Sequence, residues 1–381
     1  MPATYGFLST YPPTQCGLAT FNAALATHLN TGGGSGVVRL LSDDSVSGGI
    51  ELDRGAPRTV HTWHTDTPGG WQAAANALNR FDVVIVQHEY GIYPGDAGNE
   101  VLPLLRALRV PSIVVLHTVL SSPDPLQRQV LERIAATADA VVTMTDTARQ
   151  RLLAGYRVDP RKISVIPHGA ASRGTGAREE HERPHLLTWG LLGPGKGIEW
   201  ALRALALLGD VSPAPVYTVA GRTHPKVLEQ FGDAYRDSLK ALADSLGVAD
   251  SVVWNDAYLE EDELSRLIRS ADAVVLPYDS TEQVTSGVLI EAVGAGIPVV
   301  ATEFPHAVEL LADGPGLLVP HQDPEAMASA IRHVLAEPAR LSGRLTGLTG
   351  GPTLRWPAVA ARYQALARRL VSEPVGTPVP A

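Results

Sequence analysis

A glycine-rich stretch with one lysine, GLLGPGKGIEW at residues 190–200, is suited by its residue types to bind an anion. It follows an apolar run and precedes a helical pattern, and bare backbone amides at a helix N-terminus together with a lysine suit a diphosphate. Gly190, Gly195 and Lys196 almost satisfy the P-loop pattern, but Gly197 stands where a Ser or Thr hydroxyl should hold magnesium. The glycine spacing also differs from the dinucleotide fingerprint. The stretch therefore predicts diphosphate binding and disfavours an NTPase or a nicotinamide enzyme.

A second polar segment, PYDSTEQVTSGVLIEAVGAGIPVVAT at residues 277–302, places a loop and a helix between two apolar runs. A carboxylate in the first turns of such a helix, here Glu291, can accept two hydrogen bonds from a ribose diol. Loop amides near Thr285, Ser286 and Gly287 can hold sugar hydroxyls. A glutamate on a helix face is most often simply solvated, but the neighbours of Glu291 favour a binding role.

Gly17 belongs to a third turn, TYPPTQCGLATF at residues 10–21, between the first apolar run and a helical pattern. A bare backbone N–H at a helix N-terminus can face an anion there. An ordinary turn in which glycine relieves steric crowding fits the same pattern. Phosphate binding and a purely structural role both stay open for this segment.

Two apolar runs in the first half of the chain end in histidine. The run SIVVLH ends at His117, and VIVQHEYGIY carries His88 and Glu89 at the end of a neighbouring run. Open parallel sheets bind ligands at strand ends of this kind, although a histidine there is also commonly structural. Tyr90 and Tyr93 can stack on a sugar ring or pack the loop. We predict that His117 contacts a ligand and that His88 and Glu89 shape a neighbouring pocket.

Short apolar runs rich in Val, Ile and Leu alternate with helical stretches, which is typical of βαβ units and a parallel sheet. In the first half the runs lie at 5–9, 83–87, 112–117, 140–144 and 163–167, with amphipathic helices expected at 18–29 and 125–138. After a charged, glycine-containing linker candidate at 171–183, they restart at 185–190, 216–221, 251–255, 273–278 and 297–302. We predict an α/β fold of two Rossmann-like domains, 1–170 and 184–345, with a helix over 355–371 that packs back on the first domain.

Length and composition exclude several classes of protein. With 381 residues, two hydrophobic cores are expected. The formal charge of -9, without a dense basic block, disfavours a nucleic-acid partner. No apolar run approaches the ~20 residues needed to cross a bilayer and the first residues lack a signal-peptide pattern, so we expect no transmembrane segment and a cytoplasmic location. Cys16 is the only cysteine, which excludes an intrachain disulfide and a multi-cysteine metal site.

The segments 190–200 and 277–302 resemble the donor half of the retaining family 4 glycosyltransferases, and the similarity spans most of the chain. The resemblance implies the GT-B fold, in which two Rossmann-like parallel-sheet domains face each other across a cleft. In that family two glutamates separated by seven residues flank the donor, and Glu291 fits the second, on the ribose. The position eight residues earlier is Gln283, with Glu282 before it. Either the loop is one residue longer here or an amide replaces the sugar-side carboxylate.

The resemblance also implies how charge is arranged around the diphosphate. Lys196 is retained, whereas Leu191 stands where the family usually has an arginine. Arg222, just past the run VYTVAG, is a candidate for the missing cation, and a surface arginine is the alternative. His117 fits the histidine that touches the donor sugar from the acceptor side. Because the sequence has no Asp-x-Asp pair, we expect no metal and no other cofactor, and Lys196 with helix N-termini must neutralise the leaving diphosphate.

Together with these features, the resemblance implies a metal-independent, retaining transfer of a hexose from a UDP- or GDP-linked donor to a sugar or other hydroxyl acceptor. The expected catalytic residues are His117, Lys196, Gln283 and Glu282; the donor-binding residues are Gly17, Arg222, Thr285, Ser286, Gly287 and Glu291; the acceptor-side residues are His88, Glu89 and Tyr90. Two alternatives stay open. One is a disaccharide phosphorylase or a nucleotide-sugar epimerase on the same fold. The other is a non-catalytic sugar- or nucleotide-binding protein, which an amide at position 283 would suit.

Overall fold

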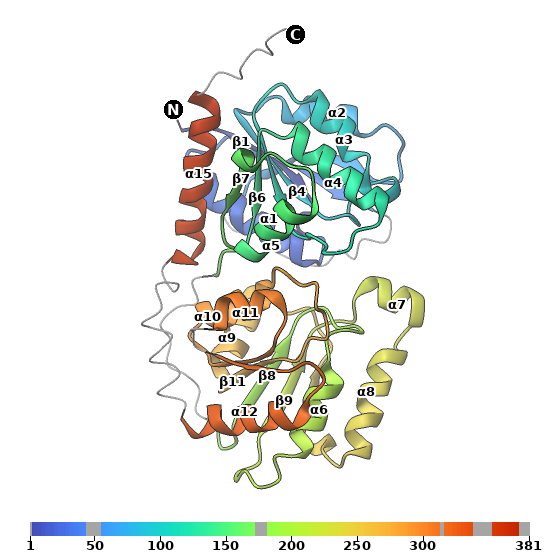
Figure 1. The fold of residues 1–381 in the computed structure, drawn as a ribbon, viewed down its shortest axis with the longest axis vertical. Helices are drawn as coiled ribbons and strands as arrows, with labels where there is room; N and C mark the ends of the chain where they lie inside the picture. The colour runs from blue at the N-terminus through green and yellow to red at the C-terminus, as the bar shows by residue number, and fades with distance from the viewer. Residues whose placement is uncertain (1, 43–54, 172–180, 313–315, 338–352, 373–381) are drawn as a thin grey trace. The chain divides into compact units, whose positions relative to one another are not determined.

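The computed structural model describes residues 2–42, 55–171, 181–312, 316–337 and 353–372, and the chain divides into two compact units (Figure 1). Unit 1 comprises Met1–Gly169 with Trp356–Ala381, and unit 2 comprises Ala170–Arg355. Each unit is built on an all-parallel sheet flanked by helices, so the predicted class, two parallel α/β sheets, is confirmed. The linker expected at 171–183 lies largely outside the described residues.

The sheet of unit 1 has seven strands in the order β3-β2-β1-β4-β5-β6-β7. They are β1 (Tyr5–Ser9), β2 (Gly36–Leu41), β3 (Arg58–His64), β4 (Val83–His88), β5 (Ser112–Leu116), β6 (Ala140–Thr143) and β7 (Ile163–Val165). The helices are α1 (Gly17–Leu29), α2 (Trp71–Leu78), α3 (Val101–Ala107), α4 (Pro125–Thr137), α5 (Asp146–Gly155) and the C-terminal α15 (Trp356–Ser372). The sequence patterns did not predict β2 and β3. β3 lies at the sheet edge with mostly polar, exposed side chains, so it has no apolar run.

One face of this sheet is covered by helices from both ends of the chain. Phe7, Ile85 and Val115 point to that face and pack with buried side chains of α1 and α15. Figure 1 shows α15 running beside unit 1, and its first residue, Trp356, has its ring centroid 5.1 Å from that of Phe21 in α1. The last described helix is therefore part of the core of unit 1.

The sheet of unit 2 has six strands in the order β10-β9-β8-β11-β12-β13. They are β8 (His185–Trp189), β9 (Val216–Ala220), β10 (Val252–Asn255), β11 (Ala273–Leu276), β12 (Val299–Thr302) and β13 (Gly316–Val319). The helices are α6 (Ile198–Ala206), α7 (Pro225–Phe231), α8 (Ala234–Ser245), α9 (Glu261–Ser270), α10 (Gly287–Gly294), α11 (Pro305–Leu311) and α12 (Pro324–Ala336). The edge strand β13 was not predicted, because it has only four residues and most of them are half-exposed.

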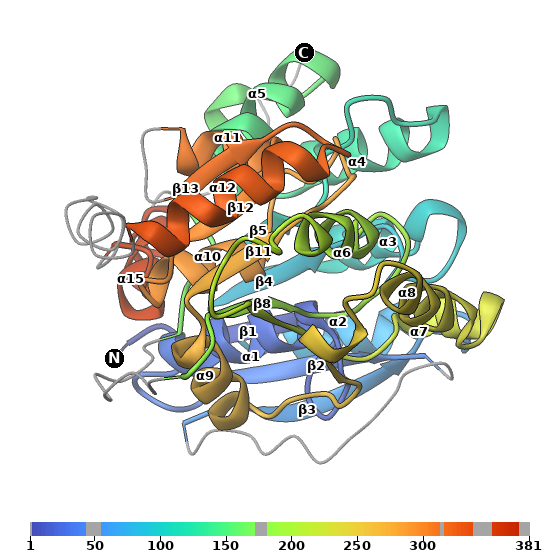
Figure 2. The same ribbon diagram turned by 90° about the horizontal axis from the view of Figure 1, so that it is seen from below.

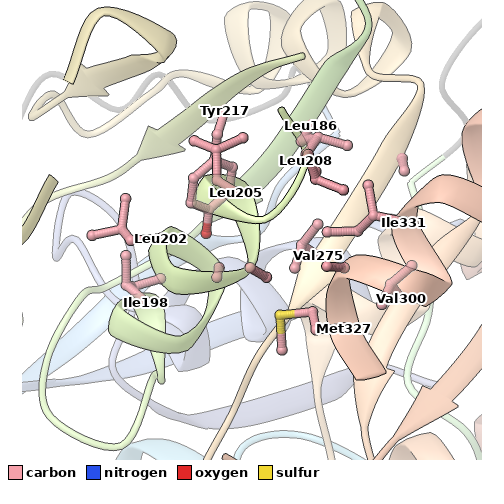
Figure 3. Packing of buried hydrophobic residues seen from close by; sticks show 14 of the residues in the cluster. Leu186, Ile198, Leu202, Leu205, Leu208, Tyr217, Val275, Val300, Met327 and Ile331 are labelled. Carbon is pink, nitrogen blue, oxygen red and sulfur yellow. The ribbon is translucent and has the colours of Figure 1, made fainter. Parts of the chain in front are cut away.

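Alternating side chains of these strands build two hydrophobic layers. Leu186 and Val275 point to the layer formed with α6, α8 and α12, part of which Figure 3 shows at close range. Leu187 and Leu276, one position along each strand, belong to the opposite layer with α10 and α11. Figure 2 shows α6 and α12 next to each other, in agreement with the contacts between them. Strands buried on both faces explain why the apolar runs of this half are nearly continuous.

Each sheet has one place where the chain order changes direction. In unit 1, β1 lies between β2 and β4, and in unit 2, β8 lies between β9 and β11. Open parallel sheets bind ligands outside the carboxyl ends of the strands at such a switch point. A binding site is therefore expected at the loops after β1 and β4 in unit 1 and at the loops after β8 and β11 in unit 2.

Candidate functional site

The glycine turn of unit 2, residues 190–197, connects β8 to α6 and is held in a conformation that requires glycine. Gly190, Gly195 and Gly197 have φ angles of 118°, 86° and 65°, in the region that disfavours other residues. A Cβ on Gly197 would lie 1.8 Å from the carbonyl oxygen of Pro277, so the turn and the loop after β11 are in direct contact. The backbone N–H of Asp279 also donates to the Gly195 oxygen at 3.0 Å. The turn is therefore fixed at the switch point of the sheet.

Lys196 extends from this turn over an aromatic ring. Its Nζ lies 4.4 Å from the centroid of Tyr278, a fully buried side chain that packs against Phe304. An ammonium over a ring face is held by the quadrupole of the ring, so Tyr278 orients the lysine without neutralising its charge. Tyr278 was not singled out from the sequence. The signal was present, since Tyr278 lies two residues after the strand that ends at Leu276.

The loop after β11 is fastened to α11 by a buried histidine that sequence reasoning missed. His306 is 3% exposed. Its Nδ1 accepts a hydrogen bond from the backbone N–H of Ser286 at 2.7 Å, and its own backbone N–H donates to the carbonyl oxygen of Gln283 at 3.3 Å. An Nδ1 that accepts carries no proton, so His306 acts here as a neutral imidazole. It fixes the shape of residues 283–286.

Most of the predicted donor-side residues surround this loop. Ser286 caps α10, its Oγ accepting from the Leu289 N–H at 3.2 Å, so Gly287 is the first residue of the helix. Glu291 lies half-buried in the second turn of α10. Thr285 has a buried hydroxyl that no described residue hydrogen-bonds. An unsatisfied buried hydroxyl costs free energy, which a ligand or water hydroxyl can recover.

Gln283 and Glu282 both lie half-buried on the loop. The side-chain amide of Gln283 donates to the Thr285 carbonyl oxygen at 3.2 Å, and the backbone N–H of Glu282 donates to the Ser280 hydroxyl at 3.3 Å. Arg222 follows β9, and its carbonyl oxygen accepts from the backbone N–H of Leu192 in the glycine turn at 2.8 Å. The structure thus places Arg222 beside Lys196's turn, where sequence analysis expected a second cation.

In unit 1, Gly17 begins α1 directly after the turn that follows β1. A Cβ added at Gly17 would meet nothing within 4 Å, so the glycine does not relieve crowding within the chain. Sequence reasoning missed a nearby cation. Arg39 of β2 donates to the hydroxyl of Thr14 in the same turn at 3.1 Å, and burial lowers the pKa of its guanidinium. Open space, a helix N-terminus and an arginine therefore meet at this turn.

His117 follows β5 and is half-buried. Its Nε2 lies 2.9 Å from the side-chain oxygen of Gln87, and its ring stands edge-to-face with Phe21 at a centroid distance of 4.8 Å. Burial, then the charges of His168 and His88, lower the pKa of His117 to about 3. The imidazole is neutral at physiological pH, so it can donate or accept hydrogen bonds but supplies no positive charge.

His88, at the end of β4, is fully buried rather than open to a pocket. It is stacked with Tyr93 at 6.4 Å and stands edge-to-face with Tyr90 at 5.1 Å. Burial lowers the pKa of His88 to about 4, and neither ring nitrogen has a hydrogen-bond partner among the described residues. The structure therefore encloses His88 against Tyr90 and Tyr93, which belong to the loop after β4.

Glu89 joins the loops after β4 and β5. Its carboxylate accepts from the backbone N–H of Tyr90 at 3.0 Å and from the hydroxyl of Thr118. Tyr90 donates to the carbonyl oxygen of Gln127 at 3.4 Å, and burial raises the pKa of its phenol. Tyr93 donates to the Gln87 carbonyl oxygen at 2.6 Å and is buried, so of its two predicted roles it packs the loop.

The predicted residues thus fall into two groups, each gathered within one unit. Lys196, Arg222, Gln283, Glu282, Thr285, Ser286, Gly287 and Glu291 surround the carboxyl ends of β8, β9 and β11, and Gly17, His88, Glu89, Tyr90 and His117 surround those of β1, β4 and β5. Within the described ranges, no group of three or more His, Cys, Asp or Glu side chains is arranged to hold a metal ion. None of the helices formed by the described residues is long and apolar enough to span a membrane.

Two family models match the chain. The model for glycosyl transferases group 1 matches residues 183–337, and the model for Glycosyltransferase Family 4 matches residues 67–171. Together these ranges take up more than half of the sequence and include the predicted residues other than Gly17.

Similar proteins include D-inositol 3-phosphate glycosyltransferases. That of Segniliparus rotundus is 32% identical over 265 residues, 65% of this chain and 57% of the relative, and that of Corynebacterium glutamicum is 28% identical over 293 residues, 69% and 68%. The chain spans about half the length of several of the curated relatives that it matches.

Solved structures share the fold over almost the whole chain. A glycosyltransferase from Rickettsia africae superimposes with a TM-score of 0.74 at 16% identity, covering 97% of this chain and 99% of that one. Anabaena HepE, solved in complex with UDP and glucose, superimposes with a TM-score of 0.70 at 14% identity, covering 96% and 100%. With both halves matched by family models and both sheets matched by solved folds, the chain belongs to the family 4 (group 1) glycosyltransferases and has the GT-B fold.

Proposed function

We propose that the chain is a retaining, metal-independent glycosyltransferase that moves a hexose from a UDP- or GDP-linked donor to a hydroxyl acceptor. The observation that carries the proposal is the glycine turn of unit 2, which holds Lys196 at the switch point of the sheet. The names of similar proteins agree with it. Relatives are named D-inositol 3-phosphate glycosyltransferases, and HepE was solved with UDP-glucose.

Unit 2 provides the donor groups in this proposal. The diphosphate lies against Lys196 and the amides of residues 190–197, because fixed N–H groups and an ammonium together suit an anion. Glu291 accepts hydrogen bonds from the ribose hydroxyls. The sugar then reaches the loop 283–286, where the Thr285 hydroxyl lacks a described partner and His306 fixes the backbone.

The chemistry follows from where charge develops. The bond between the anomeric carbon and the β-phosphate oxygen breaks, and both electrons leave with the phosphate. The acceptor oxygen forms the new bond on the same face, and its proton passes to an oxygen of the leaving phosphate, so the configuration is retained and charge balances. Lys196 and Arg222 stabilise the growing negative charge more in the transition state than in the ground state.

The first acceptor to test is a phosphorylated cyclitol, because the relatives' names contain inositol 3-phosphate. Such an acceptor offers several neutral hydroxyls and one anionic phosphate. In unit 1, the half-buried neutral His117 suits hydroxyls, while the turn with Gly17 and Arg39 suits the phosphate.

A thermal-shift screen against UDP, GDP, ADP and dTDP and their common sugars tests donor binding, since a ligand that binds only the folded state raises its melting temperature. We expect one base to stand out. Release of that nucleotide is then measured with inositol 3-phosphate and with simple sugars as acceptors. Saturable binding without turnover on any acceptor would favour a non-catalytic binding protein, and phosphate-dependent cleavage of a disaccharide would favour a phosphorylase. No binding of any nucleotide sugar would refute the proposal.

A further inference from the structure

A chain of three polar side chains crosses the core of unit 1. Asn22 lies in α1, Gln87 is the penultimate residue of β4, and His117 follows β5. The side-chain N–H of Gln87 donates to the Asn22 side-chain oxygen at 3.3 Å, and the Gln87 side-chain oxygen lies 2.9 Å from His117 Nε2. Asn22 and Gln87 are both 0% exposed. Polar groups are buried at a cost unless they are hydrogen-bonded. These two contacts satisfy the side chain of Gln87 at both ends, whereas the buried Asn22 NH₂ group has no partner among the described residues.

The order of donors fixes the proton on the histidine. Gln87 uses its NH₂ group on Asn22, so the atom that it turns to His117 is a carbonyl oxygen, which can only accept. His117 must therefore donate from Nε2. A neutral imidazole carries one ring proton, so Nδ1 is then an acceptor. The low pKa of His117 keeps the ring neutral above about pH 4, which makes the tautomer its defining chemical property.

The position of the ring makes this acceptor available. His117 is half-buried while its partner Gln87 is fully buried, so Nε2 is directed to the interior. Nδ1 has no hydrogen-bond partner among the described residues. Phe21 lies edge-to-face against the ring at 4.8 Å and restricts its rotation. The residue thus presents a single oriented acceptor at the carboxyl end of β5.

We propose that Gln87, held by Asn22, is a positioning residue that locks His117 in the Nε2–H tautomer, so that Nδ1 accepts a hydrogen bond from a hydroxyl of the bound sugar. This inference rests on the proposed function for the identity of the ligand, but the tautomer itself is a property of the protein alone. The ligand class is a neutral polyol, because an acceptor nitrogen with no charge repels an anionic oxygen and accepts from an O–H.

The direct test is ¹⁵N NMR of histidine-labelled protein at neutral pH, with the His117 signals assigned by their absence in His117→Gln. A protonated ring nitrogen resonates well apart from an unprotonated one. We expect the His117 Nε2 signal in the protonated range and the Nδ1 signal in the unprotonated range. The reverse assignment, or an even mixture, would overturn the proposal whether or not the protein has transferase activity.

Two pairs of variants test the hydrogen-bonded chain from Asn22 through Gln87 to His117. Asn22→Asp keeps an accepting oxygen in either protonation state, whereas the similarly sized Asn22→Leu removes it. We expect Asn22→Asp to keep the wild-type tautomer and Asn22→Leu to shift it. Gln87→Met removes both polar atoms at nearly constant volume and should give mixed tautomers, while Gln87→Glu keeps an acceptor toward Nε2. If Asn22→Asp shifted the tautomer and Asn22→Leu did not, the donor order would be the reverse of that proposed.

Kinetics then separate positioning from folding. For Gln87→Met we expect kcat/KM for the nucleotide sugar to fall about tenfold, the size of one hydrogen bond between neutral groups. Affinity for the free nucleoside diphosphate should not change, because it lacks the sugar, and the melting temperature shows whether the variant is folded. Should Asn22→Leu prove unfolded, Gln87→Met carries the test. Transfer by wild type with unchanged kcat/KM in folded Gln87→Met would refute the sugar contact but leave the proposed function intact. Absence of transfer in wild type would refute the proposed function, whereas the tautomer of His117 is tested separately by the NMR spectra.

Discussion

The carboxyl ends of the two sheets share the same topology but carry different chemical groups. At the end of β8 and β11, glycines with positive φ bring a lysine to the switch point, and an arginine follows the neighbouring strand. At the end of β5, His117 is half-buried, is kept neutral by burial, and is hydrogen-bonded to a pair of buried amides. One end therefore suits a diphosphate and the other suits hydroxyl groups. Parallel-sheet topology fixes where a ligand can bind, and the charge of a few side chains decides which ligand.

The largest expected effect tests whether the glycine turn is a steric necessity. Gly197→Ala places a Cβ where Pro277's carbonyl oxygen now lies, 1.8 Å away, at a residue with φ of 65°. We expect a loss of roughly 4 kcal/mol or more in the free energy of unfolding and no nucleotide binding. Gly209→Ala is the matched control, because a Cβ there meets nothing within 4 Å. Denaturant unfolding measures both, and near-native stability of Gly197→Ala would show that the loop after β11 can move away.

The second prediction separates the charge of Lys196 from the shape of the glycine turn. Lys196→Ala removes the ammonium but leaves the turn, so we expect a folded protein with turnover reduced about 10²- to 10³-fold. Lys226→Ala, which removes an exposed lysine of the adjacent helix α7, is the control for net charge and should keep its rate. Steady-state rates at saturating donor give the comparison. Equal losses in the two variants would mean that overall charge, and not the position of Lys196, drives the reaction.

A third effect concerns the neutral end of unit 1. Burial lowers the pKa of His88 from 6.5 to about 4, so between these values the unfolded chain binds a proton that the folded chain does not. Stability should therefore be flat above pH 6.5 and fall as pH drops toward 4, by up to about 1.4 kcal/mol per pH unit for this residue. His88→Phe removes the titration and leaves no unpartnered ring nitrogen. Its unfolding free energy should depend less steeply on pH, and an unchanged slope would show that His88 does not titrate on unfolding.

Sequence patterns were informative where local chemistry decides structure. The apolar runs located the central strands, and the spacing of Gly190, Gly195 and Lys196 located the glycine turn at the switch point, because strand burial and glycine geometry leave local marks in the sequence. The edge strands β3 and β13 were not predicted, because β3 is half-polar and β13 is short. The internal strand β2, GVVRLL, is apolar and mostly buried, and it was not recognised. The roles of His306 and Asn22 were not predicted from the sequence for another reason. Each acts through a partner 20 or 65 positions away, and such a contact exists only once the fold brings the residues together.

Gly17 gives the smallest expected effect and the sharpest comparison with Gly197. A Cβ at Gly17 meets nothing within 4 Å, so Gly17→Ala should change the unfolding free energy by less than about 1 kcal/mol, and any gain would come from a less flexible unfolded chain. If an anionic group of a ligand approaches the N-terminus of α1 at this open space, the added methyl group meets the ligand and not the protein. We therefore expect affinity for that ligand to fall by about tenfold, corresponding to ~1.4 kcal/mol.

Calorimetric titration with the nucleotide sugar and with the acceptor measures which ligand is affected. Loss of acceptor affinity alone would assign the turn with Arg39 to the acceptor phosphate, loss of donor affinity alone would assign it to the diphosphate, and no loss of either would make Gly17 a structural turn residue.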